Sequence, residues 1–174
     1  MDRKDGYVLW LLGPTSSGKT TIANNFLLKM RDQGVSIIQF DGDEIRDIFG
    51  SGLTFSGSDR LRVIKAIVHL VRKASKAGMN VIVSALTANL DAREYVRQNV
   101  PNLLVGYVSC SIEVCQKRDP KGLYKKAKEG KIHTLIGINS EYITPENPDI
   151  VLDTEKYSLH QITDLLIQFI ETMK

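Results

Sequence analysis

Short apolar runs alternate with stretches of helical periodicity along most of this chain. The apolar runs have the length of strands and recur between the helical stretches, which is the pattern of strand–helix–strand units and of a parallel sheet. We therefore expect an α/β fold in which a mainly parallel five-stranded sheet is flanked by helices. The expected strands are Tyr7–Leu12, Val35–Phe40, Asn80–Ser84, Leu103–Ser109 and Ile150–Leu152.

Two long helices are predicted by apolar residues at helical spacing. One spans about Ser56–Ala77, with Gly78 as its stop, and the other spans about Ser158–Met173. Their apolar stripes are interpreted as core faces and carry no function. The expected core residues are Val63, Ile64, Ile67, Leu70, Val71 and Ala74 in the first helix and Leu159, Ile162, Leu165, Leu166, Phe169 and Ile170 in the second.

The stretch 119–148 departs from this alternation. It is rich in Lys and Gly, contains three prolines, and has only a short helical signal at about Leu123–Glu129. A long, charged and weakly apolar segment inside a compact domain favours a mobile lid, with a plain surface insertion as the alternative. The length of 174 residues fits a single domain over 1–174, with the lid at about 118–148.

Composition and charge place few limits on function. The chain is 43% hydrophobic and 25% charged, which is ordinary for a globular protein, and its net charge of +3 suits a polyanionic small substrate without requiring nucleic acid. Cys110 and Cys115 are too few for a disulfide framework, so both are expected to be reduced and partly buried. The first apolar run is too short for a signal peptide, and no run reaches the length of a membrane span, so we expect a cytoplasmic protein without a membrane partner.

The clearest chemical signal is the glycine-rich stretch from Gly13 to Thr20, which reads G-x-x-x-x-G-K-T. It lies between an expected strand and a helical pattern at 21–33, where backbone N–H groups and a helix N-terminus can surround phosphates. Lys19 would reach the β- and γ-phosphates of ATP, and the Thr20 hydroxyl would ligate Mg²⁺. The stretch predicts a P-loop NTPase fold with ATP as phosphoryl donor. The expected ATP-binding residues are Gly13, Pro14, Thr15, Ser16, Ser17, Gly18, Lys19, Thr20 and Thr21.

Two aspartates follow the second expected strand. Ligands of open α/β sheets bind outside the carboxyl ends of the strands, so Asp41 and Asp43 would lie next to the glycine loop. Asp43 is the candidate to accept a proton from an attacking hydroxyl and to contact Mg²⁺, with Asp41 in support. Arg46 would share a helix face with Asp43 and hold an anionic acceptor; helix capping by Asp43 and a solvated arginine are the alternative.

Further candidates follow the third and fourth strands. Ser84 stands where many phosphate-loop enzymes carry an acidic residue, which disfavours motor and switch ATPases and leaves small-molecule kinases. In the basic run 115–127, Arg118 is a further expected ATP-binding residue that would clamp the transferring phosphoryl group, and Lys121 would hold the acceptor's phosphate. A solvated charge run is the alternative. Nucleic-acid binding is disfavoured because Tyr124 is the run's only aromatic residue.

These residues together resemble the adenylylsulfate kinases, and the resemblance covers nearly the whole chain. The most specific match is the run Arg118–Ala127. The other matching pieces, in the family's order, are Gly18-Lys19-Thr20-Thr21, Asp41-Gly42-Asp43 with Arg46, Phe55-Ser56 with Asp59-Arg60, Ser84, Arg93, Gly137-Ile138, and Tyr142 with Pro145–Pro148.

The resemblance implies a reaction and a role for each matching piece. ATP, with Mg²⁺, would phosphorylate the ribose 3′-hydroxyl of adenosine 5′-phosphosulfate. Asp43 would lie by that hydroxyl, with Lys19 and Arg118 as the other catalytic residues, and 118–137 would close as a lid with Lys121 facing the phosphosulfate. Arg46 and Arg60 would hold the anionic end of the acceptor, and Phe55 would stack on its base. Because many members are dimers, a homodimer is also expected.

The departures from the family pattern cluster around the acceptor. Val63 and Lys65 stand where the family usually has Asn and Arg, and an arginine fork is not reproduced by lysine. Leu135-Ile136 replaces Phe-Thr, and Leu86 lies in Ala85–Ala88, which replaces Phe-Ile-Ser-Pro. The full set of acceptor-binding candidates is Asp41, Asp43, Arg46, Phe55, Arg60, Val63, Ser84, Leu86, Lys121, Leu135 and Ile136.

Two other functions stay open at this point. One is a diverged member that phosphorylates another nucleotide-linked acceptor, such as cytidine diphosphoramidate in capsule modification. Leu135 in place of Phe is compatible with a smaller pyrimidine base. The other is a non-catalytic nucleotide-binding regulatory domain, against which the retained Lys19, Asp43 and Arg118 argue.

Overall fold

A computed structural model describes residues 5–173 of the chain, so residues 1–4 and 174 of the expected domain lie outside it. Within the described range, five parallel strands form one sheet in the order β2-β3-β1-β4-β5. The strands are β1 (Val8–Leu12), β2 (Ile37–Asp41), β3 (Asn80–Ser84), β4 (Leu103–Ser109) and β5 (Ile150–Asp153). The predicted α/β fold is confirmed, and the strand bounds agree within two residues.

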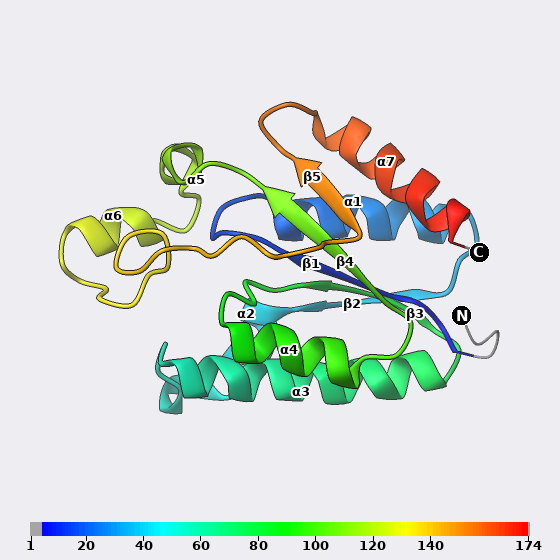
Figure 1. Cartoon of the computed structure of the whole chain (residues 1–174), viewed down its shortest axis with the longest axis horizontal. Helices are drawn as coiled ribbons and strands as arrows, with labels where there is room; N and C mark the ends of the chain where they lie inside the picture. The colour runs from blue at the N-terminus through cyan, green and yellow to red at the C-terminus, as the bar shows by residue number, and fades with distance from the viewer. Residues whose placement is uncertain (1–4, 174) are drawn as a thin grey trace.

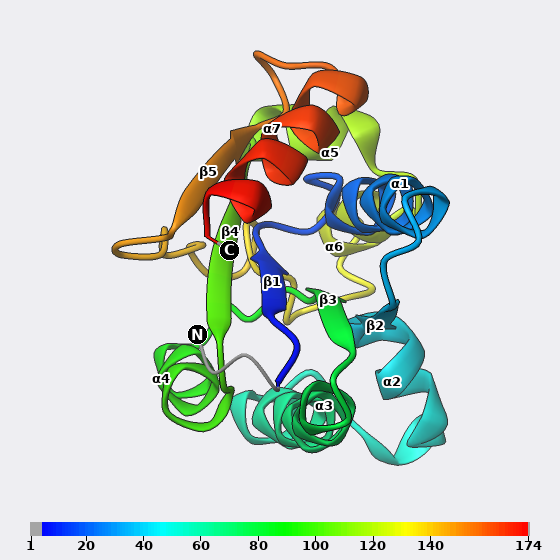
Figure 2. The same ribbon diagram turned by 90° about the vertical axis from the view of Figure 1, so that its right-hand side faces the viewer.

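Helices cover both faces of the sheet (Figures 1 and 2). The α1 and α7 helices pack on one face, and α3 and α4 pack on the other, so the central strand β1 is buried along its whole length. The helices are α1 (Lys19–Asp32), α2 (Gly42–Ile48), α3 (Gly57–Lys76), α4 (Leu90–Asn99), α5 (Ile112–Arg118), α6 (Leu123–Lys128) and α7 (Leu159–Thr172). A 3₁₀ turn, Gly50–Gly52, follows α2. Figure 1 places α5 and α6 beyond one end of the sheet, the end to which β4 points.

The two long predicted helices, α3 and α7, are confirmed. Ser56 caps α3 by accepting a hydrogen bond from the Asp59 amide, and Ser158 and Gln161 form a reciprocal capping box at α7. Three predicted core residues are instead about one-third exposed, namely Leu70, Leu159 and Leu165, each at 37%. Leu70 and Leu165 lie at the edges of their buried stripes, and Leu159 lies in the first turn of α7, where it faces a cavity.

The sequence did not predict α4 or α5. In α4 only Ala92 and Val96 are buried, and in α5 only Cys115, so neither helix carries an apolar stripe long enough to show helical periodicity. Both are short helices whose remaining residues are mainly polar or solvent-facing.

The segment 119–148 contains the predicted short helix as α6. It packs on two small apolar clusters: one holds Cys110, Cys115, Tyr124, Ala127 and Leu135, and the other holds Ala88, Ile136 and Tyr142. Asp119 fixes the start of α6, because its carboxylate accepts hydrogen bonds from the amides of Tyr124 at 3.1 Å and Lys125 at 3.0 Å. Both cysteines are free, as predicted, and both are buried. Closure of this segment as a lid stays a prediction.

No helix within residues 5–173 combines the length and apolarity that crossing a bilayer requires.

Candidate active site

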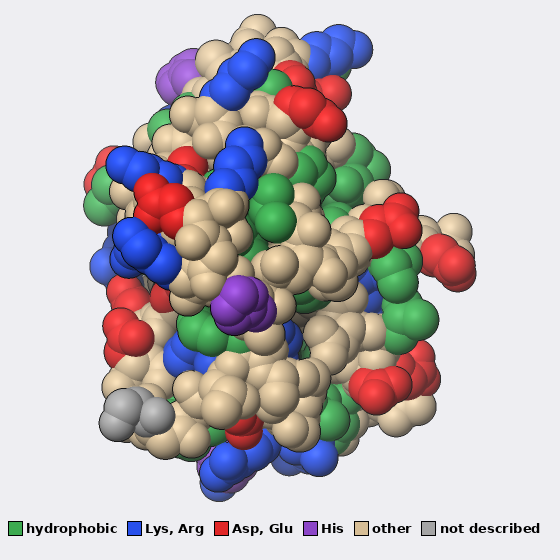
Figure 3. Space-filling model, turned by 90° about the vertical axis from the view of Figure 1, so that its left-hand side faces the viewer, with side chains coloured by type: hydrophobic (Ala, Val, Ile, Leu, Met, Phe, Trp, Pro, Cys, Tyr) green, Lys and Arg blue, Asp and Glu red, His purple; other side chains and the backbone are tan. Residues whose placement is uncertain are grey.

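A cavity of about 690 Å³ opens at the carboxyl end of the sheet. It is lined by the glycine loop, the start of α2, the first part of α3, the chain after β3, and the segment around α6. Figure 3 shows this end of the molecule as a hollowed surface with Lys and Arg side chains visible inside it. The volume lies within the range of small-molecule sites, about 300–1,000 Å³.

Backbone geometry fixes the glycine loop between β1 and α1. A Cβ on Gly13 would lie 2.4 Å from the Val108 carbonyl oxygen, so only glycine allows this approach to β4. Gly18 caps α1 in a left-handed conformation with φ of 102°. The first turn of α1 therefore starts at Lys19, with its free amides at the mouth of the loop, as anion binding requires.

Lys19 is held by the loop itself. Its Nζ donates hydrogen bonds to the carbonyl oxygens of Gly13 at 3.0 Å and Pro14 at 2.6 Å. Burial lowers the pKa of Lys19 to about 8, against the opposing influence of Asp43 and Asp41. An incoming phosphate would favour the charged amine, so this lysine is arranged to bind an anion.

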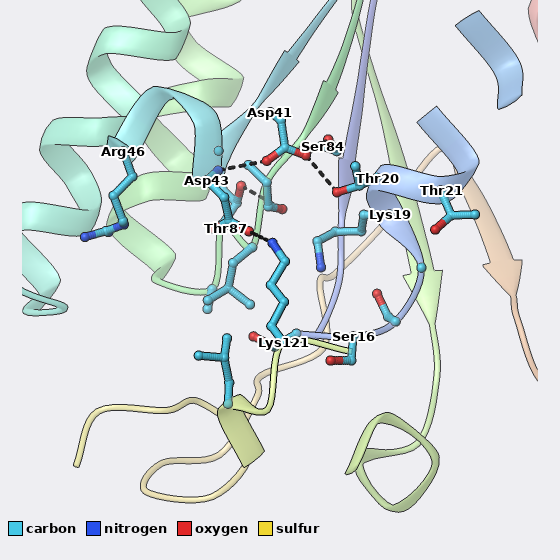
Figure 4. Close-up of a pocket in the computed structure, with 18 of the residues that line it drawn as sticks. Ser16, Lys19, Thr20, Thr21, Asp41, Asp43, Arg46, Ser84, Thr87 and Lys121 are labelled. Atoms are coloured by element: carbon cyan, nitrogen blue, oxygen red, sulfur yellow. Dashed lines mark hydrogen bonds and ion pairs between the residues drawn. The ribbon is translucent and has the colours of Figure 1, made fainter. Parts of the chain in front are cut away.

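Asp41 is the buried acidic centre of the site. Its carboxylate accepts hydrogen bonds from Thr20 Oγ1 at 2.7 Å, Ser84 Oγ at 2.6 Å and the Asp43 amide at 2.8 Å (Figure 4). Burial alone would raise the pKa of Asp41, but the three hydrogen bonds outweigh it and the pKa is lowered. The structure thus brings Thr20 to Asp41, whereas the sequence predicts Thr20 and Asp43 as the metal ligands. Asp41 is also the N-cap of α2, so the capping alternative considered for Asp43 belongs to Asp41.

Asp43 lies in the first turn of α2 and pairs with Lys121. Lys121 comes from the loop before α6, and its ammonium group donates to the Asp43 carboxylate (Figure 4). This bond raises the pKa of Lys121. Both side chains are more than half exposed, at 68% for Asp43 and 57% for Lys121. The pair joins two segments far apart in sequence across the mouth of the cavity.

Arg118 is bonded to the glycine loop and to the chain that follows β5. Its guanidinium donates to Thr154 Oγ1 and to the Thr154 carbonyl oxygen, both at 2.9 Å, and to the Ser17 carbonyl oxygen at 3.4 Å. Tyr124 adds a second link from this segment, because its hydroxyl donates to the Thr15 carbonyl oxygen at 3.0 Å. Arg118 and α6 are therefore tied to the glycine loop, beside the predicted phosphates.

Phe55 lies under two arginines. The guanidinium carbon of Arg46 is 4.6 Å from the centre of the ring, and that of Arg60 is 5.7 Å away. Arg60 also donates to the carbonyl oxygens of Phe55 at 2.9 Å and Thr134 at 2.8 Å. Burial lowers the pKa of Arg60, and the neighbouring Arg46 lowers it further. Two cations so close together form a favourable place for an anion.

The remaining predicted residues divide between the cavity and its surroundings. Val63, Leu86 and Leu135 line the cavity. Ile136 does not line the cavity. It packs in the apolar cluster with Ala88 and Tyr142, behind the residues that do. The predicted ATP-binding residues Thr15–Thr21 line the cavity, while Gly13 and Pro14 contribute the carbonyls that hold Lys19.

Several lining residues were missed from the sequence. Thr154 and Tyr157 follow β5, so the rule that ligands bind at carboxyl strand ends would have found them as it found Asp41. Thr87 follows β3 in the same way, so the same rule would have found it. Thr134 carries no such signal, since its place depends on how the chain folds back after α6.

The family model and the most similar curated relatives identify one family. A model of the family described as "Adenylylsulphate kinase" matches residues 5–153. The chain is 39% identical over 150 residues to a probable adenylyl-sulfate kinase of Archaeoglobus fulgidus, covering 86% of this chain and 97% of that protein. It is 38% identical over 166 residues to the adenylyl-sulfate kinase of Bacillus velezensis, covering 94% and 84%. The solved structure of the Mycobacterium tuberculosis APS kinase CysC in complex with AMPPNP and APS superposes with a TM-score of 0.91 at 29% identity, covering 96% of this chain and 98% of that one.

Proposed function

The chain belongs to the adenylylsulfate kinase family, and from this membership we propose that it transfers the γ-phosphoryl group of ATP to the ribose 3′-hydroxyl of adenylylsulfate. The products are 3′-phosphoadenosine 5′-phosphosulfate and ADP. The observation that carries this proposal is the extent of the family match. Residues 5–153 include the glycine loop, both aspartates and the run from Arg118 to Lys121, which are the groups that meet at one cavity.

The glycine loop holds the phosphates of ATP in this proposal. Lys19 exchanges the carbonyl oxygens of Gly13 and Pro14 for the β- and γ-phosphates. Arg118, already anchored on Thr154 beside the loop, faces the transferring group. Both cations stabilise charge that develops in the transition state, and both already lie beside the glycine loop.

The residues present fit a magnesium ion that accompanies ATP. Thr20 and Asp41 place a hydroxyl and a carboxylate oxygen 2.7 Å apart beside the glycine loop. Mg²⁺ prefers such oxygen ligands and is usually bound through one or two carboxylates together with substrate phosphates. Thr20 and Asp41 would hold the ion, which would neutralise negative charge on the β- and γ-phosphates.

Asp43 accepts the proton of the attacking 3′-hydroxyl. Its carboxylate must first be released by Lys121, and the anionic phosphosulfate of the acceptor offers Lys121 a new partner. The exchange costs little, because both side chains are more than half exposed and the ion pair is screened by water. Arg46 and Arg60 bind the anionic end of the acceptor, and Phe55 stacks on its base once the arginines turn to that anion.

The other functions raised by the sequence are not favoured. The curated relatives and the solved complex are all named as adenylylsulfate kinases. None of these comparisons supports a pyrimidine-linked acceptor or a non-catalytic domain. A homodimer, a cytoplasmic location and a lid at 118–148 stay predictions.

The proposal is tested by ADP release from Mg²⁺-ATP in the presence of adenylylsulfate, with the wild-type protein, Asp43→Asn and Glu44→Gln. We expect kcat to fall by about 100-fold or more in Asp43→Asn, because a positioned general base contributes roughly that factor. The KM for ATP should change little. Glu44 is the exposed neighbour in the same helix turn and is the matched control. A wild-type protein without adenylylsulfate-dependent ADP release would refute the function. Equal losses of kcat in both variants would contradict the role of Asp43 as the base but leave the proposed reaction standing.

A further inference from the structure

Some pieces that match the family have no role in the proposed reaction. Arg93 lies on α4, and Tyr142 and the stretch 145–148 lie on the chain that returns from α6 to β5. None of the three lines the catalytic cavity. The structure nevertheless brings them together behind one of its walls, the loop Ala85–Asn89 between β3 and α4.

Thr87 is the residue of this wall that the others hold. Its backbone has φ of 40°, a left-handed conformation that is unusual for a β-branched residue, and its side chain is buried. Its hydroxyl oxygen accepts a hydrogen bond from Trp10 Nε1 at 3.0 Å. Its carbonyl oxygen accepts one from Arg93 Nε at 2.9 Å. Such a backbone conformation persists only where its surroundings enforce it.

Packing alone does not support this wall. A second cavity of about 370 Å³ lies behind it, and Thr87 lines both this cavity and the catalytic one (Figure 4 shows Thr87 at the catalytic side). Trp10 and Arg93 line the rear cavity as well. Elsewhere in the core, close-packed side chains hold each residue in position. Behind Thr87 there is open space, so the bonds from Trp10 and Arg93 hold it instead.

Arg93 also holds the returning chain. One of its Nη atoms donates to the Ile143 carbonyl oxygen, and its guanidinium lies 5.5 Å from the centre of the Tyr142 ring. Tyr142 is stacked on Tyr107 of β4, with ring centres 6.4 Å apart. Arg93 therefore connects the cavity wall at Thr87 with the segment that leads back from α6.

We propose that Arg93 is a positioning residue for the acceptor: it sets adenylylsulfate affinity by fixing the loop Ala85–Asn89 through Thr87, without touching either substrate. This inference rests on the proposed function, since it assigns the wall after β3 to the acceptor half of the site. Leu86 and Ala88 are neighbours of Thr87 in the same wall, and Ser84 just before them bonds Asp41. Among residues 5–173, no hydrogen bond joins the glycine loop to this wall, so ATP binding should be spared.

The test compares Arg93→Gln with Arg93→Lys and Arg97→Gln. Arg97 is the matched control, because it lies one turn later on α4 and binds the carbonyl oxygens of Glu146 and Asn147 at 3.1 and 3.2 Å. It holds the returning chain but does not bond Thr87. We expect Arg93→Gln to raise the KM for adenylylsulfate about tenfold, as loss of a charged hydrogen bond predicts, with kcat and the KM for ATP nearly unchanged. Arg93→Lys should restore part of the affinity, and Arg97→Gln should leave all three constants unchanged.

A second readout does not depend on turnover. Trp10 is the chain's only tryptophan and is fully buried, so its fluorescence reports on the bond to Thr87. Its emission should shift in Arg93→Gln and not in Arg97→Gln. An unchanged emission, or equal rises of the KM values for both substrates, would overturn the inference. If the wild-type protein does not phosphorylate adenylylsulfate, the proposed function fails, and the Trp10 emission still decides whether Arg93 fixes Thr87.

Discussion

The phosphate half and the acceptor half of the cavity are built in different ways. In the phosphate half, Lys19 is bonded to backbone carbonyls of its own loop, and the carboxylate of Asp41 is buried at 5% exposure with three hydrogen-bond donors. In the acceptor half, Asp43 pairs with Lys121 at the surface, and Phe55 is half exposed beneath two arginines. The first half is thus fixed by hydrogen bonds in and around the glycine loop, whereas the second contains an ion pair and an aromatic ring near the surface.

This difference indicates what a ligand must do in each half. In the proposed reaction, ATP would meet a loop whose shape is already set, and Lys19 would only exchange carbonyl oxygens for phosphate oxygens. In the same proposal, the acceptor would displace Lys121 from Asp43 and draw the arginines away from Phe55. The proposal therefore predicts that acceptor binding rearranges side chains on α2, on α3 and before α6, which is how a closing lid would be linked to the substrate it covers.

Lys19→Ala should have the largest effect, because it breaks the phosphate half. We expect kcat/KM for ATP to fall about 1,000-fold, in line with loss of a preorganised transition-state donor. Affinity for adenylylsulfate, measured by calorimetry without ATP, should stay close to that of the wild type. Lys29→Ala is the control, since Lys29 lies on the same helix and its ammonium group contacts Asp164 and His160 of α7, outside the cavity. A matching loss in that control would mean that α1 as a whole was disturbed.

Phe55→Ala should impair the acceptor half, with a smaller effect on activity than that of Lys19→Ala. We expect the KM for adenylylsulfate to rise about tenfold, because base stacking on an aromatic ring contributes about 1–3 kcal/mol. The KM for ATP should not change. Phe49→Ala serves as the comparison, since Phe49 is similarly exposed at 40% but does not line the cavity. Equal increases in the KM values for both substrates would show that the two halves are not separable in this way.

Ser84→Ala tests the phosphate half through the stability of the fold rather than through the reaction rate. It removes one donor from buried Asp41, and a hydrogen bond to a charged group is worth about 1.5–3 kcal/mol, so Tm should fall by about 5 °C at neutral pH. The pKa of Asp41 is lower in the folded protein than in the unfolded chain. Its contribution to stability is therefore complete above the ordinary aspartate pKa of about 4 and is lost as the pH falls through the lower folded value.

The measurement for this prediction is calorimetric Tm against pH for both proteins. The Tm difference between them should be constant near neutrality and should shrink in acid. A difference that persists unchanged below the ordinary aspartate range would mean that Ser84 stabilises the fold without the charge of Asp41.

More of the phosphate half than of the acceptor half could be predicted from the sequence. The glycine loop is a local motif between a strand and a helix, so its letters and its context appear together in the sequence. The rule for carboxyl strand ends brought Asp41 and Asp43 to the site but could not tell which carboxylate faces Thr20. That choice depends on the first turn of α2, where the side chain of Asp41 turns back to cap the helix and meet Thr20.

The acceptor half depends on contacts between distant segments. Nothing in the local pattern indicates that Arg60 would reach Thr134, or that Arg93 would hold Thr87 from behind. Leu135 and Ile136 show the same limit: they are neighbours in sequence, yet only Leu135 lines the cavity. The missed helices α4 and α5 have few buried residues, so hydrophobic periodicity could not reveal them.

The most direct test is to identify the product that the wild-type protein forms from Mg²⁺-ATP and adenylylsulfate, with cytidine diphosphoramidate as the competing acceptor. The account predicts a product with one new phosphate on the ribose 3′-oxygen of adenylylsulfate, formed in equal amount to ADP. Phosphorylation of the cytidine compound alone, or of neither acceptor, would contradict it.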